Sequence, residues 1–307
     1  MAVAQDRLHP RARAILDALP ATPPLSSLTP AQARSGPIVL DAAPEAVGSV
    51  TARAIPGAAG ALMVRIYRPK DATRAALVYF HGGGFVLGSL DGADGTCRAL
   101  ANRGRVAVIS VDYRLAPETK FPGAVEDAYA ALRWVSDHAD ELHLDPNKIG
   151  VAGSSAGGSL AAAAALVARD NAGPKVAFQL LTVPVTELSA TAESFREFAE
   201  GYGLTRADME WFGRHYLRSE ADVSDPRASV LRADLRGMPP ALVITAECDP
   251  LRDDGEAYAK RLQDLGIPAS FKRYPGMFHG FMGFAGVLPE ARQAFDDAGA
   301  ALREALG

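Results

Sequence analysis

Apolar segments with the character of β-strands alternate with amphipathic helical segments through most of the 307-residue chain. Period-two alternation and short apolar runs predict strands at residues 50–55, 62–67, 76–80, 106–111, 148–152, 176–181, 241–245 and 270–274. Helical spacing predicts helices at residues 92–103, 123–138, 156–169, 253–265 and 289–306. This order predicts an α/β fold in which a mostly parallel sheet carries helices on both faces. The first two strands follow each other without a helix, so we expect an antiparallel pair at that edge.

Two regions lack this alternation. Residues 1–45 contain a helical segment and a Pro-rich stretch, and residues 187–225 are helical in pattern and rich in aromatic side chains. Neither region offers a strand to the sheet. We therefore expect both to pack together as a helical cap over a core that residues 46–186 and 226–307 form.

Composition narrows the classes of function. A net charge of −4 and a pI near 5.9 leave no basic surface for nucleic acid or anionic lipid. The N-terminal residues contain no apolar secretory segment, and Cys97 and Cys248 show neither a disulfide framework nor metal-ligand spacing. We therefore expect a cytoplasmic protein with reduced thiols. The uncharged stretch at residues 149–168 is long enough for a membrane span, but its Gly- and Ser-rich start favours a strand, a tight turn and an Ala-rich helix.

The chain contains one G-x-S-x-G motif, at residues 153–157. A nucleophile between a strand and a helix occupies a sharp turn, and side chains two positions before or after it would collide. Of the serines in this stretch, Ser154, Ser155 and Ser159, only Ser155 has glycine at both positions. Ser155 is therefore the candidate nucleophile, with close packing of small residues as the alternative for the motif taken alone.

A second glycine-rich motif, HGGGF at residues 81–85, directly follows an apolar strand. Consecutive glycines let backbone N–H groups approach a ligand, as an oxyanion hole requires. Gly83 and Gly84 are the candidate donors, together with the N–H of Ala156. The alternatives are an ordinary glycine-rich turn and a phosphate loop, although the G-x-x-x-x-G-K-[ST] pattern is absent.

A serine nucleophile requires a base, and the chain contains six histidines. His279 is the candidate, because it lies in a glycine-flanked loop after the last predicted strand and can reach the carboxyl edge of the sheet. The other histidines fit helix ends, the glycine loop, the expected cap or the N-terminal segment: His9, His81, His138, His143 and His215.

The acid that orients the imidazole is expected after another strand, between the serine and the histidine. Asp249 lies just past the predicted strand at residues 241–245 and is the candidate. Glu247, Asp253 and Asp254 compete with it, although carboxylates at a helix start commonly interact with the helix dipole. A metal site at this cluster would lack His or Cys ligands at a suitable spacing.

Together these motifs resemble the hormone-sensitive lipase family of α/β-hydrolases, also called the bacterial family IV carboxylesterases. The matching segments, in the family's order, are HGGGF (81–85), DYRLAPE (112–118), the GxSAGG core (153–158), DPLRD (249–253) and FHGF (278–281). The resemblance covers nearly the whole chain. It implies an eight-stranded sheet with a helical cap, and hydrolysis of small-molecule esters with short to medium acyl chains and no cofactor.

The resemblance also implies that the cap supplies much of the substrate pocket. Phe85, Leu204, Trp211 and Phe281 are the candidate lining residues, with core packing as an equal alternative for each. One departure concerns the nucleophile's neighbour: the family usually has Asp there, and this chain has Ser154. The turn that carries Ser155 therefore has one negative charge fewer than is usual in the family.

Other functions remain open at this point. An amidase or peptidase would use the same triad, and a non-catalytic receptor resembling the plant gibberellin receptor would use the same fold, although such receptors lack the catalytic histidine. A structural protein would require all five motifs to be accidental. The sequence does not determine the oligomeric state, and a homodimer is one alternative left open.

Overall fold

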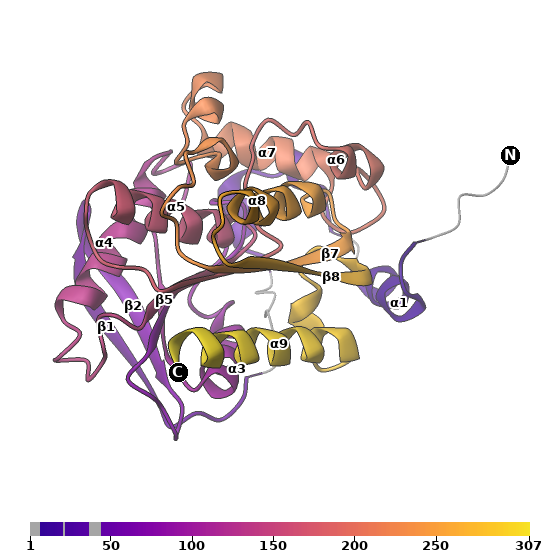
Figure 1. Ribbon diagram of the computed structural model, residues 1–307. Helices are drawn as coiled ribbons and strands as arrows, with labels where there is room; N and C mark the ends of the chain where they lie inside the picture. Colours follow the sequence, from indigo (N-terminus) through magenta and orange to yellow (C-terminus); the bar gives the residue numbers. More distant parts are fainter. Residues whose placement is uncertain (1–6, 21, 37–43) are drawn as a thin grey trace, which may run out of the picture.

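An eight-stranded sheet forms the centre of the molecule (Figure 1). The structure, a computed structural model, describes residues 7–20, 22–36 and 44–307. The strands lie in the order β1-β2-β4-β3-β5-β6-β7-β8. Their bounds are β1 Ser49–Gly57, β2 Gly60–Arg68, β3 Ala76–Phe80, β4 Ala107–Val111, β5 Ile149–Ser154, β6 Phe178–Thr182, β7 Ala241–Cys248 and β8 Ala269–Phe278.

Strand directions agree with the expected sheet. β2 pairs antiparallel with both β1 and β4, and the pairs from β4 through β8 are parallel. The predictions of a mostly parallel sheet and of an antiparallel edge pair are therefore confirmed. β3 and β4 are buried along their whole length, which explains why they read as continuous apolar runs without alternation.

Helices cover both faces of the sheet (Figure 1). On one face, α3 (Asp94–Gly104) packs against α9 (Pro289–Leu306). On the other face lie α4 (Gly123–Asp137), α5 (Ala156–Asp170) and α8 (Arg252–Asp264). Each predicted helix is present, with bounds that differ from the prediction by at most two residues.

The uncharged stretch at residues 149–168 divides into β5 and α5. Alanines 161–165 are all at most 1% exposed, because their small side chains let α5 lie close to the sheet and to α4. No helix in the described part of the chain has the length and apolarity to cross a membrane.

The two regions outside the alternation contain short helices: α1 Pro10–Ala18, η1 Leu25–Ser27, α2 Pro30–Arg34, α6 Glu193–Glu197, α7 Arg206–Tyr216 and η2 Glu220–Ser224. These regions contact each other, since the Trp211 indole N–H donates to the backbone O of Leu28 (3.1 Å) and Arg13 donates to the backbone O of Gly201 (3.0 Å). α1 also contacts the end of β8. Residues 1–6, 21 and 37–43 of the first region lie outside the described residues.

Candidate active site

Loops after β3, β5, β7 and β8 meet at one edge of the sheet. The HGGGF loop (residues 81–85) follows β3, Ser155 follows β5, Asp249 follows β7 and His279 follows β8. Because these parallel strands point the same way, their carboxyl ends bring the loops together, which is where α/β folds place their sites. The topology therefore gathers residues that lie up to about 200 positions apart in the sequence.

Ser155 lies on a sharp turn between β5 and α5, with φ 55° and ψ −120°. A Cβ atom at Gly153 would lie 2.1 Å from the backbone O of Gly157, and one at Gly157 would lie 2.0 Å from the backbone O of Phe80. Backbone atoms cannot move aside cheaply, so only glycine fits at either position. Ser159, in contrast, is buried within α5.

The side chains of Ser155, His279 and Asp249 lie within hydrogen-bond distance in series. His279 Nε2 lies 3.0 Å from Ser155 Oγ, and His279 Nδ1 lies 2.8 Å from Asp249 Oδ2. A carboxylate only accepts, so Nδ1 carries the proton and Nε2 presents its lone pair to the serine hydroxyl. The buried Asp249 also accepts from the N–H of Leu251 (2.9 Å), which fixes the carboxylate. This arrangement is competent for nucleophilic catalysis with a general base.

Three other carboxylates competed with Asp249 as the acid that orients His279, and two of them have other partners. Glu247 accepts from Arg7 and from the N–H of Gly276, and Asp253 accepts from Arg252 and from the N–H of Ser194. Burial, followed by the nearby carboxylates of Glu187, Asp253 and Asp249, raises the pKa of Asp254 to about 7. Asp254 is therefore a partly protonated neighbour of the site near neutral pH.

The HGGGF loop has three consecutive residues with positive φ: Gly83 (114°), Gly84 (59°) and Phe85 (65°). A Cβ atom on Gly83 would lie 2.3 Å from the backbone O of Leu87, so the turn closes too tightly for a side chain. Within the described part of the chain, the N–H groups of Gly83, Gly84 and Ala156 donate to no backbone carbonyl. Ala156 begins α5, where the first N–H groups of a helix have no partner within the helix.

His81 supports the start of this loop. Its ring is buried, stacks on Tyr113 at 4.3 Å between ring centroids, and has Nδ1 2.8 Å from the backbone O of Gly82. Burial lowers the pKa of His81 to about 4, so the ring is neutral at neutral pH and Nδ1 is the donor. Among the described residues, Nε2 of His81 has no hydrogen-bond partner.

A cavity of about 680 Å³ opens over Ser155 and His279. Gly83, Gly84, Phe85 and Leu204 are among the residues that line it. Other lining residues are Val185 and, from the aromatic region and the N-terminal segment, Ala33, Arg34, Gly36, Leu188, Met209, Phe212, Gly213 and Tyr216. The cavity therefore lies between the sheet edge, the HGGGF loop and the short helices outside the sheet.

Two expected lining residues lie elsewhere. Trp211 is 2% exposed and directs its indole N–H to the backbone O of Leu28, away from the cavity. Phe281 is fully buried and packs on Tyr274, with 5.1 Å between ring centroids. Both side chains are used in packing, the alternative that the sequence left open for them.

Sequence reasoning missed three cavity residues on α7: Met209, Phe212 and Tyr216. They recur at i, i+3 and i+7 and so share one helix face, a pattern that the sequence contains. The ring of Phe212 lies directly over Gly84, where a Cβ atom would be 2.2 Å from its carbons. Tyr216 stacks on Phe85 at 3.8 Å. The helix therefore contacts the HGGGF loop directly.

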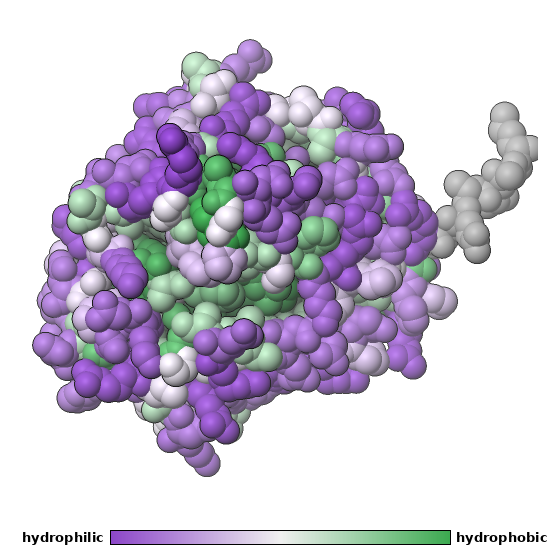
Figure 2. All heavy atoms as spheres, in the orientation of Figure 1, coloured by the Kyte–Doolittle hydropathy of each residue, from purple (hydrophilic) through white to green (hydrophobic). Residues whose placement is uncertain are grey.

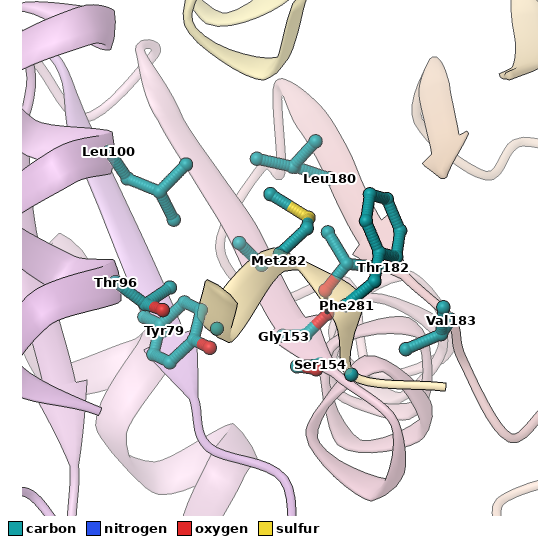
Figure 3. A pocket seen from close by; sticks show the side chains of 13 residues that line it. Tyr79, Thr96, Leu100, Gly153, Ser154, Leu180, Thr182, Val183, Phe281 and Met282 are labelled. Carbon is teal, nitrogen blue, oxygen red and sulfur yellow. Dashed lines mark hydrogen bonds between the residues drawn. The ribbon is translucent and has the colours of Figure 1, made fainter. Parts of the chain in front are cut away.

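A second, smaller cavity of about 40 Å³ lies behind Ser154 (Figure 3). Hydroxyl groups of Tyr79, Thr96, Ser154 and Thr182 lie around it, among mainly apolar side chains. Ser154 lines both cavities. The position at which this chain departs from the hormone-sensitive lipase pattern therefore lies in the wall between the active-site cavity and a small hydroxyl-bearing space.

Among the described residues, no group of three or more His, Cys, Asp or Glu side chains is arranged to hold a metal ion.

Comparison with known proteins shows which family the chain resembles. A model of the alpha/beta hydrolase fold family matches residues 77–283. In Mycobacterium tuberculosis, the carboxylic ester hydrolase LipN is 44% identical over 241 residues, which are 76% of this chain and 64% of LipN, slightly less than two thirds of that relative. The esterase LipI of the same organism is 44% identical over 82% of this chain and 81% of LipI.

A solved esterase structure from Pyrobaculum calidifontis is 44% identical, has a TM-score of 0.91, and covers 98% of this chain and 100% of that one. The similarity thus includes the sheet, the glycine motifs and the regions outside the sheet. The chain belongs to the α/β-hydrolase fold family and, within it, to the hormone-sensitive lipase group of esterases.

Proposed function

We propose that this chain is a serine carboxylesterase that hydrolyses small esters with short to medium acyl chains. Ester hydrolysis by an α/β-hydrolase is the activity that the relatives indicate. One observation supports the assignment of a serine nucleophile. Ser155 Oγ lies 3.0 Å from His279 Nε2, and His279 Nδ1 lies 2.8 Å from Asp249 Oδ2.

The proposed reaction begins when His279 Nε2 takes the proton of Ser155 as Oγ attacks the ester carbonyl carbon. The carbonyl oxygen becomes an oxyanion, to which the N–H groups of Gly83, Gly84 and Ala156 donate. Asp249 holds the imidazole in the required tautomer. The protonated His279 gives its proton to the leaving alcohol, and water then repeats the sequence to release the acid.

The charges around the cavity favour a neutral substrate. Among the described residues, two charged side chains reach its lining, Arg34 and Asp91. Arg34 is paired with Glu118 and Asp91 with Arg65, at 2.8 and 2.7 Å. Neither charge is left to attract an ionic substrate. A volume of about 680 Å³ falls within the usual range for small-molecule sites, which supports short to medium acyl chains.

The two alternative functions, an amidase and a non-catalytic receptor, are distinguished from an esterase in different ways. An amidase would use the same triad, and matched ester and amide substrates separate the two reactions by their turnover. A non-catalytic receptor would not require His279 in line with Ser155, and the 3.0 Å contact between these residues argues against that function.

Replacement of Ser155 tests the proposal. Ser155→Ala is expected to lower kcat for p-nitrophenyl acetate by a factor on the order of 10⁶, because the triad acts as a unit. Ser154→Ala is the matched control, since its hydroxyl has no place in the proposed chemistry. Residual turnover above a few per cent in pure Ser155→Ala protein would refute the assignment.

We further propose that residues 1–45 and 187–225 form one cap over the core 46–186 and 226–307. The contacts Trp211 to Leu28 and Arg13 to Gly201 support this division. A limited proteolysis pattern with cleavage sites spread evenly over the chain, and not concentrated in these two regions, would argue against it.

We also propose a homodimer and a cytoplasmic location. β8 is an edge strand, and its Phe271 is 42% exposed. Figure 2 shows hydrophobic residues gathered in the middle of the face that β7 and β8 cross in Figure 1. An exposed edge strand can pair with a second copy, and a monomer mass by light scattering would contradict this. The cytoplasmic proposal rests on the two buried thiols, Cys97 and Cys248; fractionation of cells tests it.

A further inference from the structure

The guanidinium of Arg34, at the end of α2, joins three segments that are distant in the sequence. Its Nε donates to the backbone O of Val86 (2.8 Å), and its Nη2 donates to the backbone O of Ala116 (2.5 Å). Nη1 and Nη2 also donate to the two carboxylate oxygens of Glu118, each at 2.8 Å. All three nitrogens are engaged, and a bidentate pair fixes the plane of the group. Arg34 is thus held in one orientation.

The Val86 carbonyl belongs to the turn that closes the HGGGF loop. The N–H of Val86 donates to the backbone O of Gly83 (3.0 Å), and the N–H of Ala116 donates to the backbone O of Phe85 (2.9 Å). Arg34 connects the two sides of this arrangement, because it donates to the carbonyls of both Val86 and Ala116. A shift of its guanidinium would therefore be transmitted to the peptide groups of residues 83–86.

This loop needs external support. Gly83, Gly84 and Phe85 all have positive φ, and Phe85 is not a glycine. Strained conformations of this kind persist where the surrounding structure holds them from several sides. Tyr216 holds the ring of Phe85 by stacking, while the hydrogen bonds at Val86 and Ala116 hold the backbone.

Arg34 is not available to bind an anionic substrate, although it reaches the cavity wall beside Ala33 and Gly36. Its charge is neutralised by Glu118, and the hydrogen bond from Arg34 lowers the pKa of that carboxyl to about 2. The Glu118 carboxyl therefore stays ionised through the neutral range, opposite the guanidinium. Arg34 can therefore affect the reaction only through the HGGGF loop, whose backbone it holds in place.

We propose that Arg34 is a positioning residue for catalysis. The N-terminal segment at residues 22–36 is a strap across the cavity, and the guanidinium of Arg34 keeps the N–H groups of Gly83 and Gly84 where the oxyanion forms. This inference rests on the proposed function. It adds that a residue outside the core, more than 100 positions before Ser155, controls kcat and not only substrate binding.

Kinetics of Arg34→Ala with p-nitrophenyl acetate test the proposal. The acetyl group needs little of the cavity, so we expect kcat to fall about 10- to 100-fold with KM changed by less than about threefold, as for other small misplacements of catalytic groups. Millimolar guanidinium chloride is expected to restore part of kcat, and equal sodium chloride is not. Arg13→Ala is the matched control: Arg13 also bonds a backbone carbonyl from the N-terminal segment, that of Gly201, but it does not line the cavity.

The outcomes separate the inference from the proposed function. If wild-type protein does not hydrolyse the ester, the proposed function itself fails. If wild type is active and Arg34→Ala keeps its kcat, or loses only KM, Arg34 merely lines the cavity and the inference is wrong. A kcat loss that guanidinium does not restore also counts against it.

Arg34→Lys carries the test if Arg34→Ala does not fold. Lysine keeps the charge toward Glu118 but cannot reach both carbonyls and both carboxylate oxygens together. A lowered kcat at unchanged melting temperature supports the inference, and wild-type kcat in Arg34→Lys contradicts it.

Discussion

At the scale of the residue, Ser155 combines a strained backbone with dense support. Its φ of 55° and ψ of −120° are unusual for a residue other than glycine and cost about 1–3 kcal/mol. The N–H of Ser155 donates to Thr182 O (2.9 Å), and its own carbonyl accepts from Gly158 and Val185 (2.9 and 3.2 Å). The neighbouring strands and the start of α5 thus hold the turn that projects Oγ toward His279. Strain is concentrated where the proposed chemistry requires an exposed nucleophile.

Asp254 leads to a prediction about stability and pH. Its pKa is about 7 in the folded protein against 3.8 for an unperturbed Asp carboxyl, so between these values the folded state binds more protons than the unfolded state. Stability from this group is therefore fully present at low pH and is lost as pH rises through 7. Linkage makes the loss on the order of a few kcal/mol.

Asp254→Asn removes this titration while keeping the shape of the side chain. Thermal unfolding at about pH 5 and about pH 8 is expected to show a larger gain in melting temperature over wild type at the higher pH, because the loss begins above 3.8 and is complete only above 7. Asp264→Asn, an exposed carboxylate at the far end of α8, is the matched control. An equal gain at both pH values would mean that the Asp254 carboxyl is not the titrating group.

At the scale of the element, α7 uses two faces for two purposes. A capping box between Thr205 and Asp208 sets where the helix starts and therefore which side chains face the cavity. Phe212 faces the HGGGF loop, whereas Trp211, one residue earlier, binds the N-terminal segment through Leu28. Two adjacent aromatic residues thus make different contacts, one with the HGGGF loop and the other with the N-terminal segment.

Replacement of each aromatic residue tests this division. Trp211→Phe removes one hydrogen bond, so we expect a loss of about 1 kcal/mol of stability, faster hydrogen exchange in residues 22–36, and little change in KM. Phe212→Leu is expected to change KM for esters with longer acyl chains and to leave exchange in residues 22–36 unaltered. If Trp211→Phe has the larger effect on KM, the assignment of the two faces is reversed.

At the scale of the whole molecule, sequence patterns predict best what depends on strand ends. Ser155, Asp249 and His279 could be selected because each follows a strand, and parallel strands end at one edge of the sheet. The orientation of Trp211 was harder to predict. The side of α7 on which a residue lies depends on where the helix begins, and the capping box at Thr205 sets that start. Phe281 follows His279 closely, but the turn at Gly280 sends it back into the core.

The contacts of Arg34 were not predictable from periodicity at all. Its partners, Val86 and Glu118, lie 52 and 84 positions away in the sequence. Only the folded arrangement shows that an N-terminal arginine reaches the loop after β3. Local patterns therefore predict elements and their end points, while contacts between distant loops require the tertiary structure.

The central claim is that Ser155, activated by His279, is the nucleophile. Reaction with a fluorophosphonate probe, followed by fragmentation of the peptide that contains Ser154, Ser155 and Ser159, tests it most directly. We predict one adduct, on Ser155, and labelling of His279→Ala slower by a factor on the order of 10³ or more, because the hydroxyl loses its base. An adduct on Ser154 or Ser159, or equal labelling of wild type and His279→Ala, would contradict the account.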